Sequence, residues 1–191
     1  ATLSLNTRVQ IAAALADGVA MRGVERLTGA SRETIGSFLL AFGRGCSLVH
    51  AARMHELTCD VLQLDEVWAY VGVKEGHKGD LHPEEYGDTY TFVALDAVSR
   101  AVVSYVTDKR TAIATQRFAA DIRARVTGKP QLNSDGFIAY PIAIEYAFGT
   151  KVHYAKNLKT YAKDEAGGAS RDDVRYSRGR CIASQKIPVI G

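Results

Sequence analysis

Residues 61–73 (VLQLDEVWAYVGV) form a mostly apolar stretch that carries two adjacent carboxylates, Asp65 and Glu66, in its middle. Both alternating sets of side chains contain apolar or aromatic residues, which predicts a central β-strand that is covered on both faces. A buried carboxylate without a partner is costly, so each acid needs a cation, a metal ion or several hydrogen-bond donors. We expect Glu66 to pair with an arginine and Asp65 to be a metal ligand.

The composition is that of a water-soluble globular protein, with 47% hydrophobic and 24% charged residues among 191. This length accommodates one domain of ordinary size and a small second one. No apolar run approaches the length of a membrane span, and the chain does not start with a signal-peptide pattern. The cysteines, Cys46, Cys59 and Cys181, are widely spaced and form no C-x-x-C pair, which predicts neither a disulfide framework nor a zinc ribbon. We therefore expect a cytoplasmic protein.

The net charge of +3 is distributed unevenly along the chain. Residues 1–50 hold five Arg against three acids (+2), residues 51–150 ten basic against fourteen acidic side chains (−4), and residues 151–191 nine against four (+5). An acidic centre suits metal ions, and basic flanks suit a polyanion. An ordinary solvated surface explains imbalances of this size as well.

The first part of the chain predicts three short helices over residues 8–16, 21–28 and 32–42. Gly29 and Ala30 form a tight turn between the second and third helices, and Ser31 is placed to cap the third. Two helices joined by a short turn that contains glycine match the helix-turn-helix pattern of DNA-binding proteins.

The third predicted helix would present Arg32, Glu33, Thr34 and Ser37 outward, where base edges and phosphates can be met. We expect Arg32, Thr34 and Ser37 to bind DNA. A plain three-helix packing module is the alternative. The predicted organisation is a helical module over residues 1–50 and a second domain over residues 51–191.

The rest of the chain alternates between strand and helix patterns. The loop after the first strand contains His77 and His82, whose spacing fits no standard zinc pattern and favours a solvated loop. The elements that follow are predicted at residues 90–95 (strand), 101–106 (strand), 112–126 (helix), 131–134 (strand), 140–148 (helix) and 151–155 (strand). Three strands, a helix, a strand, a helix and a strand predict an α/β fold with a mixed sheet and flanking helices.

Asp135 directly follows the fourth predicted strand, which itself follows the first crossover helix. That strand can lie parallel to the first strand and beside it. Asp65 and Asp135 would then lie on adjacent strands, close enough to share a metal ion.

The order of these elements resembles the ribonuclease H-like fold, and the motifs resemble those of DDE-type transposases of small bacterial insertion sequences. The segments that carry this resemblance are LDEVWAYVG (64–72), YTFVALDAVSR (90–100), the helix after Lys109 and Arg110, LNSDGFIAY (132–140) and FGTKVHYAK (148–156). The DEVW and SDG motifs are specific only in combination and in this order. The resemblance extends from residue 61 to about residue 163, with the helix-turn-helix in front of it.

The resemblance implies an Asp-Asp-Glu triad that binds two Mg²⁺ (or Mn²⁺) ions, with Asp65 as its first member and Asp135 as its second. The third member should lie on a helix beyond the fifth strand, where the sequence predicts no helix with an acid. We therefore expect the third carboxylate to lie beyond Gly191, in which case this chain is C-terminally truncated and catalytically inactive. Glu165 as a substitute and Asp96 as an auxiliary ligand are weaker alternatives.

The implied function is metal-dependent cleavage and strand transfer of double-stranded DNA, at terminal inverted repeats and at a target site. The basic segment 151–186, which includes Lys156 and Lys159, would lie along the phosphates. We expect a homodimer or a larger assembly on DNA, because two ends must be joined. We also expect the protein to be cytoplasmic and associated with the nucleoid. The alternatives are a truncated, catalytically dead DNA-binding repressor of transposition and a ribonuclease H-like nuclease.

Overall fold

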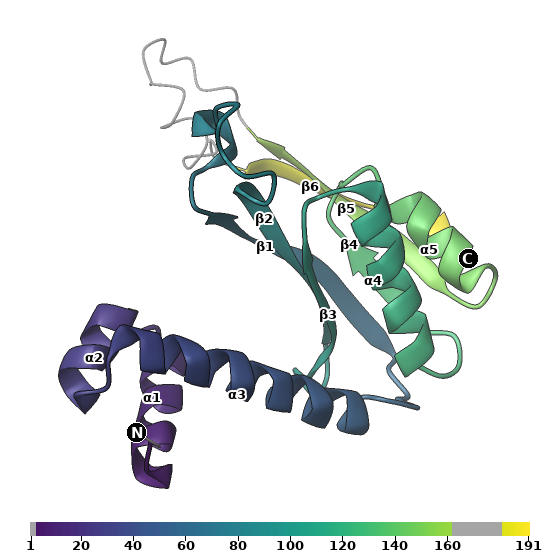
Figure 1. The fold of residues 1–191 in the computed structure, drawn as a ribbon. Coiled ribbons are helices and arrows are strands. Elements are labelled where there is room, and N and C mark those ends of the chain that lie inside the picture. The colour runs from purple at the N-terminus through teal and green to yellow at the C-terminus, as the bar shows by residue number, and fades with distance from the viewer. Residues whose placement is uncertain (1–2, 162–180) are drawn as a thin grey trace. The chain divides into compact units, whose positions relative to one another are not determined.

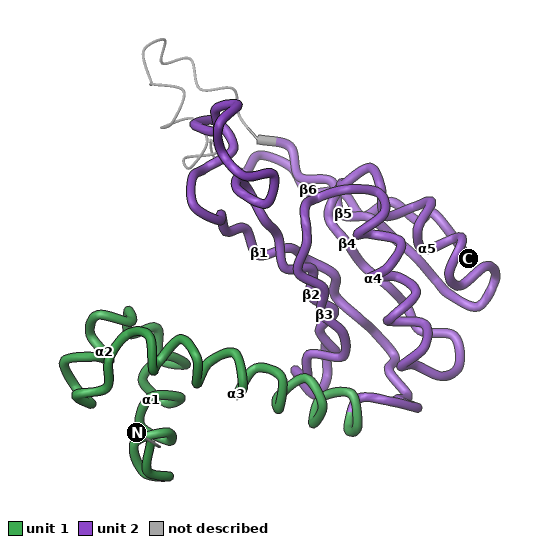
Figure 2. Tube along the Cα trace, in the orientation of Figure 1, with its two compact units in different colours: residues 1–53 green, residues 54–191 purple. Residues whose placement is uncertain are grey.

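The computed structural model describes residues 3–161 and 181–191, and its elements are labelled in Figure 1. The chain divides into two compact units, residues 1–53 and residues 54–191 (Figure 2). Residues 162–180, which include Glu165 and part of the basic segment 151–186, lie outside the described residues.

The first unit consists of three helices, α1 (Leu5–Ala16), α2 (Met21–Thr28) and α3 (Arg32–Arg53). The three helices pack around a small core of buried apolar residues, namely Ile11, Val24, Ala30 and Ile35. The turn between α2 and α3 depends on Gly29, whose φ of 71° is the left-handed conformation that glycine adopts without strain. The Ser31 hydroxyl accepts a hydrogen bond from the Thr34 N–H at 3.3 Å, as expected for the residue that caps α3.

Helix α3 is twice as long as the predicted helix over residues 32–42, because it continues through Gly43 and Gly45 to Arg53. Glycine lowers helix propensity by only about 1 kcal/mol per residue, which the surrounding helix formers offset. Most of the added turns are exposed, including Leu48 and Val49. Helix α3 therefore includes residues 51–53, which were predicted to belong to the second domain.

Among the described residues, α3 is the one helix whose length and mean hydropathy of 1.3 would suffice to cross a membrane. This finding corrects the expectation that no apolar segment reaches such a length. A single helix of this kind near the N-terminus is weak evidence for a membrane span. Arg44 lies in the middle of α3, where a charge is costly in a bilayer.

The second unit contains one six-stranded mixed sheet in the order β3-β2-β1-β4-β5-β6. Its strands are β1 (Val61–Val71), β2 (Gly87–Asp96), β3 (Val102–Asp108), β4 (Gln131–Ser134), β5 (His153–Tyr161) and β6 (Cys181–Ile190). The helical elements are a short turn of 3₁₀ helix (Glu75–His77), α4 (Ala112–Arg125) and α5 (Tyr140–Phe148).

The pairing within the sheet is antiparallel between β1, β2 and β3 and parallel between β1, β4 and β5. This order and these directions are those expected of a ribonuclease H-like core, so the predicted mixed sheet with flanking helices is confirmed. Parallel neighbours require crossover connections, and α4 and α5 provide them.

Within the second unit, helices cover only one face of β1, contrary to the prediction that both faces are covered. Leu62 and Leu64 are buried against Phe118 and Ile122 of α4 and Ile144 of α5, and both helices lie on this face of the sheet (Figure 1). The alternate side chains, such as Val67 with 62% exposure, are not covered by a helix in the described part of the second unit. The apolar character of both sets correctly predicted a central strand but did not show which face the helices would cover.

Two apolar residues, Leu27 of α2 and Ile113 of α4, are largely exposed. Each lies within one turn of a helix end, where the helical period alone does not determine what the side chain meets. The predicted bounds of α2, β4 and α5 are those of the structure.

The C-terminal part of the sheet differs most from the prediction. Strand β5 runs from His153 to Tyr161 instead of ending at residue 155, and β6 pairs with it in antiparallel fashion. The pairing with β6 explains the extension, because it satisfies the backbone groups of the outer half of β5. The segment ending in Ile190, which was not assigned, is therefore an edge strand.

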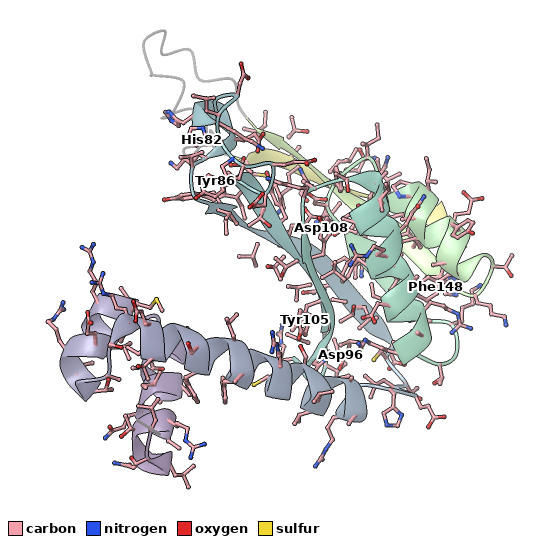
Figure 3. The ribbon with its side chains drawn as sticks, in the orientation of Figure 1. His82, Tyr86, Asp96, Tyr105, Asp108 and Phe148 are labelled. Carbon is pink, nitrogen blue, oxygen red and sulfur yellow. The ribbon has the colours of Figure 1, made fainter. Side chains whose placement is uncertain are left out.

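Asp96 ends β2 and organises the turn to β3. Its Oδ2 accepts hydrogen bonds from the Ser99 N–H at 2.8 Å and from the Ser99 hydroxyl at 2.5 Å. These hydrogen bonds from Ser99 hold the pKa of the Asp96 carboxyl below its usual range. Figure 3 places Asp96 at the opposite end of the sheet from His82 and Tyr86.

Asp96→Asn is expected to lower the free energy of unfolding by roughly 1 kcal/mol at pH 7, because the ionised acceptor is lost. A depressed pKa contributes stability above the unfolded pKa of about 3.9, and this stability disappears as pH falls through the folded pKa. Urea unfolding should therefore show a smaller difference from wild type at pH 2.5 than at pH 7. Asp80→Asn, in an exposed loop, is the control, and an equal loss at both pH values would contradict the role assigned to Asp96.

Candidate active site

Asp65 and Asp135 lie at the same level of two adjacent strands. In the parallel pair β1 and β4, Gln63 is opposite Asn133. Asp65 lies two residues after Gln63 and is still within β1. Asp135 lies two residues after Asn133 and is the first residue after β4. The strands separate at this point, as parallel strands do at the carboxyl ends where α/β proteins place their sites.

Both aspartates line one open cleft of about 820 Å³. Acidic, basic and aromatic side chains share its wall, and the lining residues are Asp65, Glu66, Trp68, Asp88, Tyr90, Arg110, Asp135, Gly136, Phe137, Ile138, Asn157, Leu158 and Lys159. They come from β1, β2, β5 and the segments that follow β3 and β4. The topology of the sheet therefore gathers residues that are far apart in the sequence.

Each aspartate is oriented by a backbone N–H and keeps an oxygen toward the cleft. Oδ1 of Asp65 accepts a hydrogen bond from the Glu66 N–H at 2.9 Å. Oδ1 of Asp135 accepts one from the Phe137 N–H, also at 2.9 Å, which fixes the turn into α5. Asp65 is exposed and the Asp135 side chain is 48% exposed, so both carboxylates are accessible to a ligand.

Glu66 points to the helix-covered side of the sheet, and its side chain is only 4% exposed. Its Oε2 accepts a hydrogen bond from Arg110 Nη2 at 2.9 Å, which confirms the expected arginine partner. Its Oε1 is buried without a hydrogen bond. Burial raises the pKa of the Glu66 carboxyl, and the nearby Tyr140 hydroxyl, followed by the charge of Arg110, counteracts this effect.

The Tyr140 hydroxyl, at the start of α5, is the other buried polar atom here without a completed hydrogen bond. Burial, and next the nearby charge of Glu66, raise the pKa of Tyr140 far above its usual value. The phenol therefore stays protonated, and its dipole faces the buried carboxylate region.

Arg110 was not singled out from the sequence, although it connects the acids of the cleft. It lies between β3 and Thr111, whose hydroxyl caps α4. Its Nη2 also approaches Asp135 Oδ2 at 3.3 Å, and its guanidinium lies 3.9 Å from the centre of the Phe137 ring. The sequence around Arg110 gave no sign of this role, because its partners, Glu66 and Asp135, belong to distant parts of the chain.

The predicted DNA-binding residues lie in both units. Lys159 lines the cleft, and Lys156 pairs with Ser134 in the register of β5 and β4. Arg32 and Ser37 are exposed on α3, and Thr34 lies on the same first turns with partial exposure. The Arg32 guanidinium lies 3.2 Å from Glu25 of α2, so contact with a phosphate would compete with this ion pair.

The oxygen donors of Asp65 and Asp135 fit Mg²⁺ or Mn²⁺, which bind through one or two carboxylates and keep several waters. Within the described residues, no group of three or more His, Cys, Asp or Glu side chains is arranged to hold a metal ion. Asp96, the proposed auxiliary ligand, is not in the cleft and is occupied by Ser99, so that alternative is wrong. His82 accepts a hydrogen bond from the Gly79 N–H within its own loop.

Comparison with known proteins gives no match to a protein-family model and none to a curated protein. Among solved structures, a piggyBac transposase synaptic complex with hairpin DNA is 13% identical with a TM-score of 0.35 over 65% of this chain. The Mos1 strand transfer complex is 14% identical (TM-score 0.32, 75% of this chain), and a Mos1 mariner paired-end complex with Mn is 15% identical (0.30, 75%). The chain spans 27% of the piggyBac chain and 55% of the chain in the strand transfer complex. With TM-scores this low, the fold assignment rests on the strand order and directions.

Arg110→Met is expected to lower the free energy of unfolding by roughly 2–3 kcal/mol, because it leaves Glu66 buried without its cation. The double variant Glu66→Gln/Arg110→Met should recover most of this loss, since no unpaired charge then remains. Urea unfolding at pH 7.5 measures both. Arg117→Met is the control: its guanidinium pairs with Asp108 at 2.8 Å on the surface, and the change should cost less than about 1 kcal/mol. No recovery in the double variant would contradict the pairing.

Proposed function

We propose that this chain is the core of a DDE-type DNA transposase, a polynucleotidyl transferase that cuts and joins DNA at the ends of an insertion sequence. The supporting observation is the placement of Asp65 and Asp135 at the same level of two adjacent parallel strands, with both side chains in one cleft. Two carboxylates in this arrangement suit cation-assisted phosphoryl transfer.

In the proposed mechanism, Asp65 and Asp135 would hold the divalent cations, and the N–H groups of Glu66 and Phe137 keep the two carboxylates oriented. Bound Mg²⁺ or Mn²⁺ would supply activation of the attacking water or 3′-hydroxyl and charge stabilisation of the leaving oxygen. Lys159 supplies positive charge in the same cleft for the DNA backbone.

In this proposal, two further groups of residues contact the DNA. Arg32, Thr34 and Ser37 of the helical unit read or grip the terminal inverted repeats, and Lys156 of β5 contacts phosphates near the cleft. Joining two ends calls for a homodimer or a larger assembly on DNA. We place the protein in the cytoplasm, on the nucleoid.

One observation favours the second candidate, a DNA-binding repressor that does not cut. The described residues arrange two aspartates in the cleft but no group of three donors for a metal ion. Binding two metal ions needs a further ligand, which in an active transposase we propose to be the glutamate of the triad. A protein without that glutamate would bind DNA but would not cut it.

Metal binding is the first test. Addition of Mn²⁺ is expected to broaden the amide resonances around Asp65 and Asp135, because both carboxylates face the cleft. Asp65→Asn and Asp135→Asn should each weaken Mn²⁺ binding about tenfold or more, by loss of one anionic ligand. Asp108→Asn, a partly exposed acid that is paired with Arg117, should leave Mn²⁺ binding unchanged. Broadening at neither aspartate would remove the metal site.

DNA binding by the helical unit is the second test. Arg32→Ala and Ser37→Ala should each weaken DNA binding by roughly 1 kcal/mol, and Arg32→Ala should also reduce its salt dependence. Fluorescence anisotropy with a labelled end sequence measures this. Arg8→Ala on α1 is the matched control, and affinity unchanged by deletion of residues 1–45 would refute the helix-turn-helix assignment.

Activity is the third test, with a pre-cut DNA end, a supercoiled target and Mn²⁺. We expect joining that requires Mn²⁺ and that is abolished by Asp65→Ala or Asp135→Ala, because loss of one triad member removes most of the rate. DNA binding without any joining would favour the repressor. Joining that survives both substitutions would refute the proposed site.

A further inference from the structure

One nitrogen atom, Nη2 of Arg110, touches two carboxylates of the cleft. It lies 2.9 Å from Glu66 Oε2 and 3.3 Å from Asp135 Oδ2. The shorter contact is made to the buried acid and the longer one to the acid that faces solvent. The guanidinium therefore sits between a permanent counter-ion and a candidate metal ligand.

The position of Arg110 is fixed from several sides. Its guanidinium lies 3.9 Å from the centre of the Phe137 ring and 5.7 Å from that of Tyr90. The next residue, Thr111, begins α4 as its cap, so the backbone is held as well. A planar cation between aromatic faces and carboxylates has little freedom to leave the cleft.

Both oxygens of Asp135 are engaged. Oδ1 accepts a hydrogen bond from the Phe137 N–H at 2.9 Å, and Oδ2 accepts one from Arg110. A divalent cation that binds Asp135 must share Oδ2 with the guanidinium or displace it. Two positive groups on one oxygen repel each other, and the long 3.3 Å contact is the one that can open.

We propose that Arg110 is a positioning residue that competes with the divalent cation for Asp135, and that Glu66 retains Arg110 when the cation binds. This inference rests on the proposed metal site. In the metal-free protein Arg110 neutralises part of the acidic cleft and restrains Asp135. When Asp135 Oδ2 is taken by the cation, the guanidinium keeps its closer contact with Glu66 and stays available beside the DNA phosphate.

A purely structural ion pair predicts a different outcome. If Glu66 and Arg110 only stabilise the fold, then replacement of both by neutral side chains of similar size leaves the affinity of the cleft for Mn²⁺ unchanged. The double variant Glu66→Gln/Arg110→Met is suited to this question, because it removes one negative and one positive charge. The net charge near Asp65 and Asp135 is then the same as in wild type.

The experiment measures Mn²⁺ dissociation constants without DNA, from the electron paramagnetic resonance signal of the free ion. The double variant is expected to bind Mn²⁺ about fivefold more tightly than wild type, equivalent to roughly 1 kcal/mol, since Oδ2 no longer has a competing cation. Glu66→Gln alone is expected to bind more weakly than wild type, because Arg110 then has Asp135 as its remaining ionised partner. Glu145→Gln, an exposed acid on α5, controls for the loss of one negative charge elsewhere.

An affinity of the double variant equal to or weaker than that of wild type would overturn the inference, as would stronger binding by Glu66→Gln. Thermal unfolding of each variant establishes that it is folded, and the double variant keeps the test valid even if Arg110→Met alone unfolds. Asp135→Asn separates the two levels. If Asp135→Asn binds Mn²⁺ as tightly as wild type, the proposed metal site is refuted. If Asp135→Asn binds more weakly, but the double variant and Glu66→Gln do not differ from wild type as expected, only the role of Arg110 is refuted.

Discussion

The parallel pairing of β1 with β4 is the constraint on which the site depends. It brings residues that are separated by seventy positions, Asp65 and Asp135, to the same level of the sheet. Parallel neighbours cannot be joined by a hairpin, so the chain makes a crossover through α4 before it returns as β4. Because β4 ends one residue before Asp135, the carboxylate emerges where the two strands separate.

The alternation of side chains along β1 divides two adjacent acids between two environments. Asp65 faces solvent, while Glu66 lies under the helices and needs a cation there. The same cation, Arg110, reaches Asp135, so the buried acid and the solvent-facing acid of the cleft share one counter-ion. A structural requirement of the core thereby shapes the electrostatics of the candidate site.

The sequence predicted most elements because their signals are local. Gly29 with its left-handed backbone, the hydroxyl caps at Ser31 and Thr111, and Pro141 near the start of α5 all act within one helical turn. The errors fall where distant partners decide. Helix α3 continues past two glycines, and β5 is extended by its pairing with β6, which no local pattern in the sequence indicated.

The sequence by itself determined that Asp65 and Asp135 lie on adjacent strands, in which order the strands and helices follow, and that Glu66 needs an arginine partner. Tertiary structure alone decided which arginine that is, which face of β1 is covered, and that Asp96 serves a turn instead of the cleft. The physical reason is the range of the interactions. Periodicity and capping depend on residues within one or two turns, whereas ion pairs and burial depend on segments that only the folded sheet brings together.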